Sequence, residues 1–206
     1  MNAPRRALSF VDASLVLADA RSLSAPIKVA ATLFVAALTA AASQFSVPLP
    51  FTPVPFTLQP MIVLLGGAVL GPALGLASQV IYLAAGLAGL PVFAFSPELP
   101  QGAARLLGPT GGYLMAYPLA AWVAGVLATR GFDRRYLTSV LALAAGLAVI
   151  FTGGVLWLTL FAPGADARSL SAALATGFYP FVIADAIKVC LAATVMPAAW
   201  RYLLGD

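Results

Sequence analysis

The longest stretch without a charged side chain decides the class of this protein. It covers 69 residues, from Val29 to Pro97, and reads VAATLFVAALTAAASQFSVPLPFTPVPFTLQPMIVLLGGAVLGPALGLASQVIYLAAGLAGLPVFAFSP. One helix needs about 20 apolar residues to cross a bilayer, so this stretch is long enough for three crossings. In the whole chain 62% of the residues are hydrophobic and 9% are charged, whereas about 25% are charged in a soluble domain. The sequence therefore predicts an all-α, polytopic membrane protein.

Breaks in the apolar pattern divide the chain into a polar N-terminal segment, residues 1–28, and one membrane domain, residues 29–203. Within the first segment, residues 7–20 are expected to form a short interfacial helix. We predict six membrane spans, at 29–46, 58–70, 72–90, 112–129, 137–161 and 172–200. Pro180 is expected to kink the last span or to mark its start, because proline lacks the N–H that a helix interior uses.

The distribution of basic residues predicts the orientation of the six spans. Eight basic residues would lie on the side of the termini: Arg5, Arg6, Arg21, Lys28, Arg130, Arg134, Arg135 and Arg201. Only Arg105 and Arg168 would lie on the other side. Basic residues favour the cytoplasmic side, so we predict cytoplasmic termini in the inner cell membrane, with the loops 47–57 and 91–111 outside.

Several function classes are excluded by residues that the chain lacks. Cys190 is the single cysteine and there is no histidine, which removes internal disulfides and the commonest metal and haem sites. The glycines near residue 110 are not followed by a lysine, so there is no ATPase motif of the Walker type. Hydrolase motifs are also missing, and the basic residues do not cluster as nucleic-acid binding requires. We expect no enzyme, no cofactor and no nucleic-acid partner.

One acidic and one basic residue interrupt the last apolar run, in Ile183-Ala-Asp-Ala-Ile-Lys188. A single charge near the centre of a membrane helix costs about 2.5–3.5 kcal/mol. Asp185 and Lys188 are three residues apart, so they lie on roughly one face of a helix, in a stripe with Phe178 and Phe181. The pair could form the floor of an outward-facing pocket, with Asp185 accepting and Lys188 donating hydrogen bonds. The alternative is a structural ion pair that fixes helix packing.

The segment Val47–Pro60 contains five prolines in fourteen residues and cannot form a regular helix. Irregular apolar backbone is tolerated at membrane depth only when it is buried in protein or lines a cavity. This segment is therefore either a stiff plug over a ligand site or a plain rigid connector.

Small and polar residues also follow helical spacings in two spans. Gln79 and Tyr82 share a stripe with three glycines in the span 72–90, and such a stripe faces protein or a cavity. In the first span, Ala36 pairs with Ala40, and Ala37 with Ala41. These small-residue pairs let another helix approach closely, either within the protein or from a partner.

Four motifs, in this order along the chain, resemble those of the BioY family. They are Pro48-Leu-Pro-Phe-Thr-Pro-Val-Pro-Phe-Thr-Leu-Gln59, Gly86-Leu-Ala-Gly-Leu-Pro-Val-Phe-Ala94, Gly108-Pro-Thr-Gly-Gly-Tyr-Leu114 and the pair Asp185 and Lys188. Members of that family are biotin-binding substrate (S) components of energy-coupling-factor (ECF) transporters. The resemblance covers about residues 28–200 and implies six helices, an outer biotin pocket, a transmembrane T protein and two ABC ATPases as partners.

The resemblance also implies roles for individual residues. Asp185 and Lys188 would bind polar groups of biotin, and Arg105 is a candidate for its carboxylate. Further pocket residues would be Gln79, Tyr82, Thr110, Gly111 and Tyr113. Ala36, Ala37, Ala40 and Ala41 would face the T protein. Pro60 departs from the family pattern, so the start of the second span is expected to differ locally.

The function predicted from the sequence is thus capture of biotin for uptake. Two other functions stay open at this point: an S component for a different vitamin such as thiamine, and a proton-coupled secondary carrier that uses Asp185. A membrane scaffold with a structural ion pair is a third hypothesis.

Overall fold

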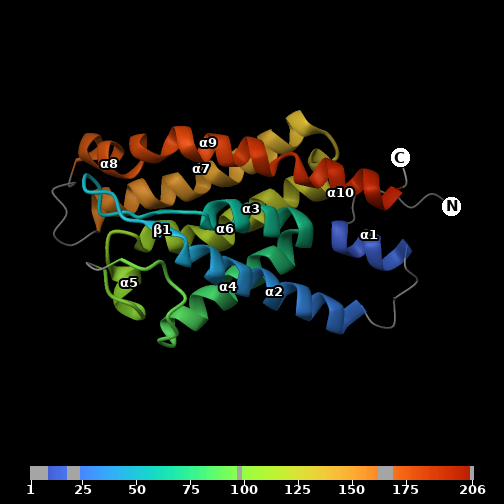
Figure 1. The fold of residues 1–206 in the computed structure, drawn as a ribbon, viewed down its shortest axis with the longest axis horizontal. Coiled ribbons are helices and arrows are strands. Elements are labelled where there is room, and N and C mark those ends of the chain that lie inside the picture. The colour runs from blue at the N-terminus through green and yellow to red at the C-terminus, as the bar shows by residue number, and fades with distance from the viewer. Residues whose placement is uncertain (1–8, 18–23, 97–98, 162–168, 205–206) are drawn as a thin grey trace.

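The fold is a bundle of helices with one very short β-ribbon, seen in a computed structural model that describes residues 9–17, 24–96, 99–161 and 169–204 (Figure 1). The helices are α1 (Phe10–Leu17), α2 (Ser24–Gln44), α3 (Gln59–Leu70), α4 (Pro72–Leu87), α5 (Ala103–Leu107), α6 (Gly111–Thr129), α7 (Tyr136–Leu160), α8 (Leu170–Gly177), α9 (Tyr179–Ala192) and α10 (Val195–Leu204). A 3-10 turn, η2 (Phe132–Arg134), joins α6 to α7. Strands β1 (Ser46–Val47) and β2 (Phe56–Thr57) pair in antiparallel fashion.

Four helical stretches in the described part of the chain are long and apolar enough to cross a membrane. They are Ser24–Gln44, Gly111–Thr129, Tyr136–Leu160 and Tyr179–Leu204. The helices α3 and α4 are also apolar but shorter. The protein is therefore a helical membrane protein, as the uncharged stretch predicts.

The last predicted span, 172–200, is divided into three helices rather than one. Helix α8 ends at Gly177, and α9 begins at Tyr179 with Pro180 in its first turn. Proline is tolerated there because the first N–H groups of a helix have no partner within it. A second break at Ala193 and Thr194 separates α9 from α10. Pro60 occupies a comparable place in the first turn of α3, so this departure from the family pattern fits the helix start.

The turn between α3 and α4 depends on Gly71, whose φ is +79°. Residues with a side chain rarely adopt this angle, whereas glycine does so at little cost. Pro72 then starts α4 at the position where its fixed φ suits a helix. The two short helices are thus a single apolar stretch folded back at a required glycine.

Helix α6 is the centre of the bundle and packs against α3, α4 and α7. Its side chains Ala120, Ala121 and Ala124 are fully buried. Gly67 of α3 lies so close to this helix that a Cβ on it would stand 2.2 Å from the backbone oxygen of Ala121. The core is therefore built on close backbone approach, the usual way for helices to associate in lipid.

The alanines of the first span lie on two faces of α2. Ala36 is buried and Ala40 is partly buried against the core, while Ala37 and Ala41 are exposed. Ala36 and Ala40 therefore serve internal packing, whereas Ala37 and Ala41 lie on an outward surface.

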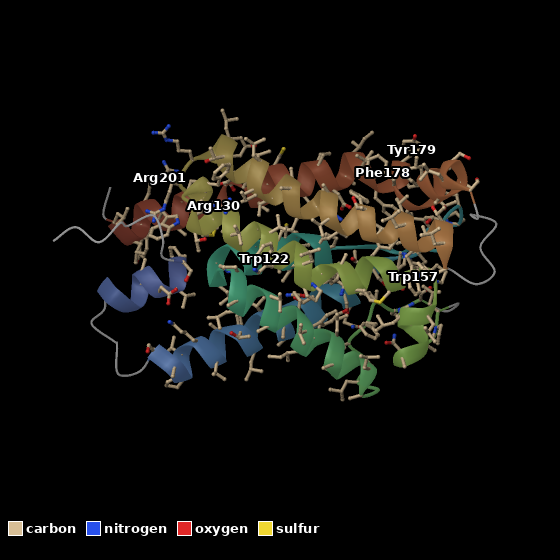
Figure 2. All side chains as sticks on the ribbon, turned by 180° about the vertical axis from the view of Figure 1, so that it is seen from behind. Trp122, Arg130, Trp157, Phe178, Tyr179 and Arg201 are labelled. Carbon is tan, nitrogen blue, oxygen red and sulfur yellow. The ribbon has the colours of Figure 1, made fainter. Side chains whose placement is uncertain are left out.

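Residues 48–55 of the proline-rich segment join β1 to β2 and cross the end of the bundle where α5 and α8 also lie (Figure 1). We call residues 46–57 the strap. Thr52 fixes it to α8, because its hydroxyl donates a 2.6 Å hydrogen bond to the carbonyl of Thr176. Arg130 and Arg201 lie at the opposite end of the bundle, as Figure 2 shows.

The packing at Gly67 yields a stability prediction. In an ordinary helix Gly→Ala is favourable by about 1 kcal/mol. Here we expect Gly67→Ala to destabilise the protein by about 1–3 kcal/mol. The added methyl group would clash with backbone atoms, which cannot move away as a flexible side chain can. Thermal unfolding in detergent measures this, with Ala73→Leu at an exposed position of α4 as the control. An unfolding midpoint for Gly67→Ala equal to or above that of the unmodified protein would contradict this packing.

Candidate ligand-binding site

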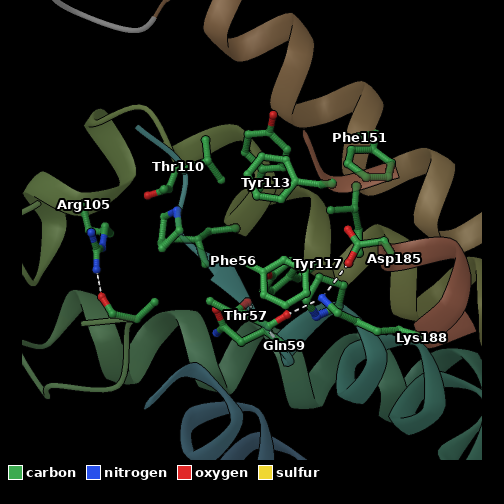
Figure 3. Close-up of a pocket in the computed structure, with 17 residues that line it drawn as sticks. Phe56, Thr57, Gln59, Arg105, Thr110, Tyr113, Tyr117, Phe151, Asp185 and Lys188 are labelled. Carbon is green, nitrogen blue, oxygen red and sulfur yellow. Dashed lines mark hydrogen bonds and ion pairs between the residues drawn. The ribbon is translucent and has the colours of Figure 1, made fainter. Parts of the chain in front are cut away.

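A pocket lies beneath the strap, between α5, α6, α7 and α9 (Figure 3). Its walls come from the strap and α3 (Val54, Pro55, Phe56, Thr57, Gln59, Pro60), from α5 and the loops beside it (Arg105, Ala94, Thr110), from α6 (Tyr113, Leu114, Tyr117), from α7 (Ile150, Phe151) and from α9 (Phe181, Asp185, Lys188). The later part of the proline-rich segment, from Val54 on, therefore lines a cavity.

Asp185 and Lys188 form a buried ion pair at one end of this pocket. The Lys188 ammonium donates a 2.7 Å hydrogen bond to the Asp185 carboxylate and a 2.6 Å hydrogen bond to the carbonyl of Thr57. The same ammonium stands 3.6 Å from the centre of the Phe56 ring, within the range of a cation–π contact. Lys188 thus joins α9 to the end of the strap, while Asp185 has no other donor among the described residues.

Aromatic side chains form the middle of the pocket. Tyr113, Tyr117, Phe151 and Phe181 line it from three different helices. The Tyr113 hydroxyl donates a 2.7 Å hydrogen bond to the carbonyl of Gly177, which fixes the ring against α8. Phe178, predicted in the same stripe as Phe181, packs edge-on behind Phe151 instead of lining the pocket.

Arg105 and Thr110 supply polar groups at the other end, away from the ion pair (Figure 3). The guanidinium of Arg105 is 1% exposed and donates from Nη2 to the carbonyl of Ala94. Its Nη1 and the Thr110 hydroxyl are buried without a hydrogen-bond partner among the described residues. Burial lowers the pKa of Arg105, yet an arginine stays cationic at neutral pH. Such unpaired buried groups mark a place where a ligand can bond.

The structure brings five of the eight predicted site residues to the pocket wall: Asp185, Lys188, Arg105, Thr110 and Tyr113. The other three lie outside the wall. Gln79 is buried between α2 and α4, where its amide donates to Thr39 at 3.3 Å. Tyr82 stands behind the wall, and Gly111 allows the start of α6 to pass close to the carbonyl of Leu106.

Sequence reasoning missed Gln59 and Tyr117, which both line the pocket. Gln59 ends the proline-rich motif, and its position there is the signal that could have identified it. Tyr117 lies one turn after Tyr113 on α6, a spacing that puts both rings on one face. In the described residues, no three His, Cys, Asp or Glu side chains meet as a metal site requires.

A family model, described as the BioY family, matches residues 16–205. The chain belongs to the BioY family. A protein of Pyrococcus horikoshii named "Probable biotin transporter BioY" is 42% identical over 163 residues, which cover 79% of this chain and 89% of that protein. The "Biotin transporter BioY" of Thermotoga maritima is 38% identical over 147 residues, covering 71% of this chain and 81% of its own.

One solved structure also resembles this BioY family member. It is an S-component for biotin from an ECF-type ABC transporter, with a TM-score of 0.73 and 26% sequence identity. The match covers 84% of this chain and 90% of the solved one. The structural match therefore agrees with the assignment of this chain to the BioY family.

The contacts of Lys188 predict an order of stability for the ligand-free protein. In Asp185→Asn, Lys188 keeps the Thr57 carbonyl and the Phe56 ring, whereas Lys188→Met leaves the Asp185 carboxylate without a charged partner. Removing one member of a fully buried pair costs about 3–5 kcal/mol. We expect Lys188→Met to lower the unfolding midpoint more than Asp185→Asn, and the double variant to regain part of the loss.

Thermal unfolding of the three variants without ligand checks this order, with Ala144→Leu at an exposed position of α7 as the control. A larger loss in Asp185→Asn than in Lys188→Met would show that the strap contact of Lys188 contributes little.

Proposed function

We propose that this protein is the biotin-binding substrate-capture component of an ECF-type vitamin uptake transporter. The observation that carries the proposal is a pocket with an ion pair at one end, an arginine whose Nη1 has no partner among the described residues at the other, and aromatic rings between them. The names of the relatives, all biotin transporters, point to the same ligand.

Biotin has chemical groups that match both ends of the pocket. Its ureido ring offers two N–H donors and one carbonyl, and its aliphatic tail ends in a carboxylate. We propose that the ureido ring meets Asp185 and Lys188 and that the carboxylate meets Arg105 and Thr110. The opposite orientation would bring the ligand's carboxylate next to the Asp185 carboxylate, and like charges in a low-dielectric pocket repel strongly.

In our proposal the protein crosses the inner cell membrane six times, α3 and α4 included, with both termini in the cytoplasm. The basic side chains Arg130 and Arg201 lie at the end of the bundle opposite the strap, which supports this orientation. The pocket and the strap would then be near the outer surface, where a scarce vitamin arrives.

ATP-driven transport would need partners, because the chain has no ATPase motif of the Walker type. We propose a T protein and two ABC ATPases in that role. The exposed alanines Ala37 and Ala41 of α2 suit close approach of a partner helix, whereas Ala36 is used inside the bundle. Biotin would bind from outside, the strap and the 91–111 loop would close over it, and the T protein would reorient the body for inward release.

Titration of the purified protein with biotin, and with thiamine as the control ligand, tests the proposal. We expect a dissociation constant for biotin below micromolar and no comparable binding of thiamine. Arg105→Met should weaken biotin binding by about 10- to 100-fold, since it removes a buried charged hydrogen bond. The same variant should leave the affinity for biotinamide, which lacks the carboxylate, nearly unchanged.

Arg201→Met is the matched control, because it removes an exposed arginine at the far end of the bundle. Absence of biotin binding below micromolar concentration would overturn the proposed ligand. An equal loss for biotin and biotinamide in Arg105→Met would overturn the role of Arg105 alone.

A further inference from the structure

Gln59 is a buried polar residue of the pocket wall with an unused hydrogen-bonding group. It is 2% exposed and is the first residue of α3, separated from the strap by Leu58 alone. Its side-chain N–H donates a 2.6 Å hydrogen bond to the hydroxyl of Tyr82. The amide oxygen accepts no hydrogen bond from any described residue. Because Gln59 lines the pocket, this oxygen is available to accept a hydrogen bond from a ligand.

Tyr82 holds this amide in one orientation. Its ring is 1% exposed, packs edge-on against Phe93 with centroids 5.7 Å apart, and lies 6.4 Å from the ring of Tyr117. The Tyr82 hydroxyl, fixed by two neighbouring rings, determines the direction of the Gln59 N–H. Because the amide is planar, it also determines where the amide oxygen lies.

Gln59 also lies beside the ion pair. The carbonyl that accepts the hydrogen bond from Lys188 belongs to Thr57, only two residues earlier, and the Gln59 backbone N–H contacts the Thr57 hydroxyl at 3.4 Å. Figure 3 shows Gln59, Thr57 and Lys188 together at this end of the pocket. The acceptor of Gln59 and the charges of α9 thus belong to one polar end.

We propose that Gln59 is a further ligand-binding residue whose amide oxygen accepts one of the two ureido N–H groups, and that Tyr82 is its positioning residue. This inference rests on the proposed function. The polar end would then contain two acceptors, from Asp185 and Gln59, and one donor, from Lys188. A cyclic urea has the complementary set of two N–H donors and one carbonyl, so this arrangement determines specificity for that ring.

Two biotin analogues test the contact, each methylated on a different ureido nitrogen. The affinities of the unmodified protein and of Gln59→Met for biotin and for both analogues are measured by calorimetry. Methionine keeps the length of the side chain but has no amide. We expect Gln59→Met to weaken biotin binding about tenfold and to reduce the preference for biotin over one analogue by a similar factor. The preference for biotin over the other analogue should be unchanged, because Asp185 still accepts a hydrogen bond from that N–H.

Tyr82→Phe is the second variant, since it keeps the ring and removes only the hydroxyl. It should reduce the preference over the same analogue, about two- to tenfold, through loss of the fixed amide orientation. A purely structural role of Tyr82 would lower the affinities for all three ligands equally. Tyr202→Phe, at an exposed tyrosine of α10 outside the pocket, is the matched control.

The outcomes separate the two proposals. If the unmodified protein does not bind biotin, both the proposed function and the proposed contact of Gln59 are overturned. If the protein binds biotin but Gln59→Met and Tyr82→Phe keep both preferences unchanged, only the inference about Gln59 is overturned.

Discussion

The ammonium group of Lys188 contacts the Asp185 carboxylate, the Thr57 carbonyl and the face of Phe56 at the same time. Thr57 lies 131 residues earlier in the chain, so this contact closes the strap onto α9. A buried charge is costly alone, and three partners offset that cost. The same ammonium group therefore lines the pocket and holds the strap against α9.

The pocket also depends on glycines that make room for its aromatic wall. A Cβ on Gly154 of α7 would lie 2.1 Å from the ring of Tyr113, and one on Gly177 of α8 would lie 2.2 Å from its hydroxyl. Tyr113 can therefore stand between α7 and α8 only because both positions lack a side chain. The close packing of α6 with α3 and α7 serves the same purpose, since it sets where Tyr113 and Tyr117 stand relative to Asp185.

The membrane class and the polar end of the site could be predicted from the sequence, because both follow from charge. A long apolar stretch without charges predicts membrane-spanning helices. Two opposite charges inside another such stretch are expected to pair with each other in a protected place. The direction in which uncharged side chains point could not be predicted in the same way. Gln79 and Tyr82 share a stripe, but the rotation of α4 turns Gln79 toward α2 and Tyr82 toward the back of the wall. Helix rotation is set by packing with several neighbours at once. The break of the last span at Pro180, in contrast, could be predicted, because proline is favoured in the first turn of a helix.

A crystal structure of the protein with bound biotin tests the two-ended pocket most directly. The ureido ring should lie against Asp185 and Lys188, with the carboxylate within about 2.7–3.2 Å of the Arg105 guanidinium and the Thr110 hydroxyl. Biotin bound in the opposite direction, or outside the space between the strap and α9, would contradict this account.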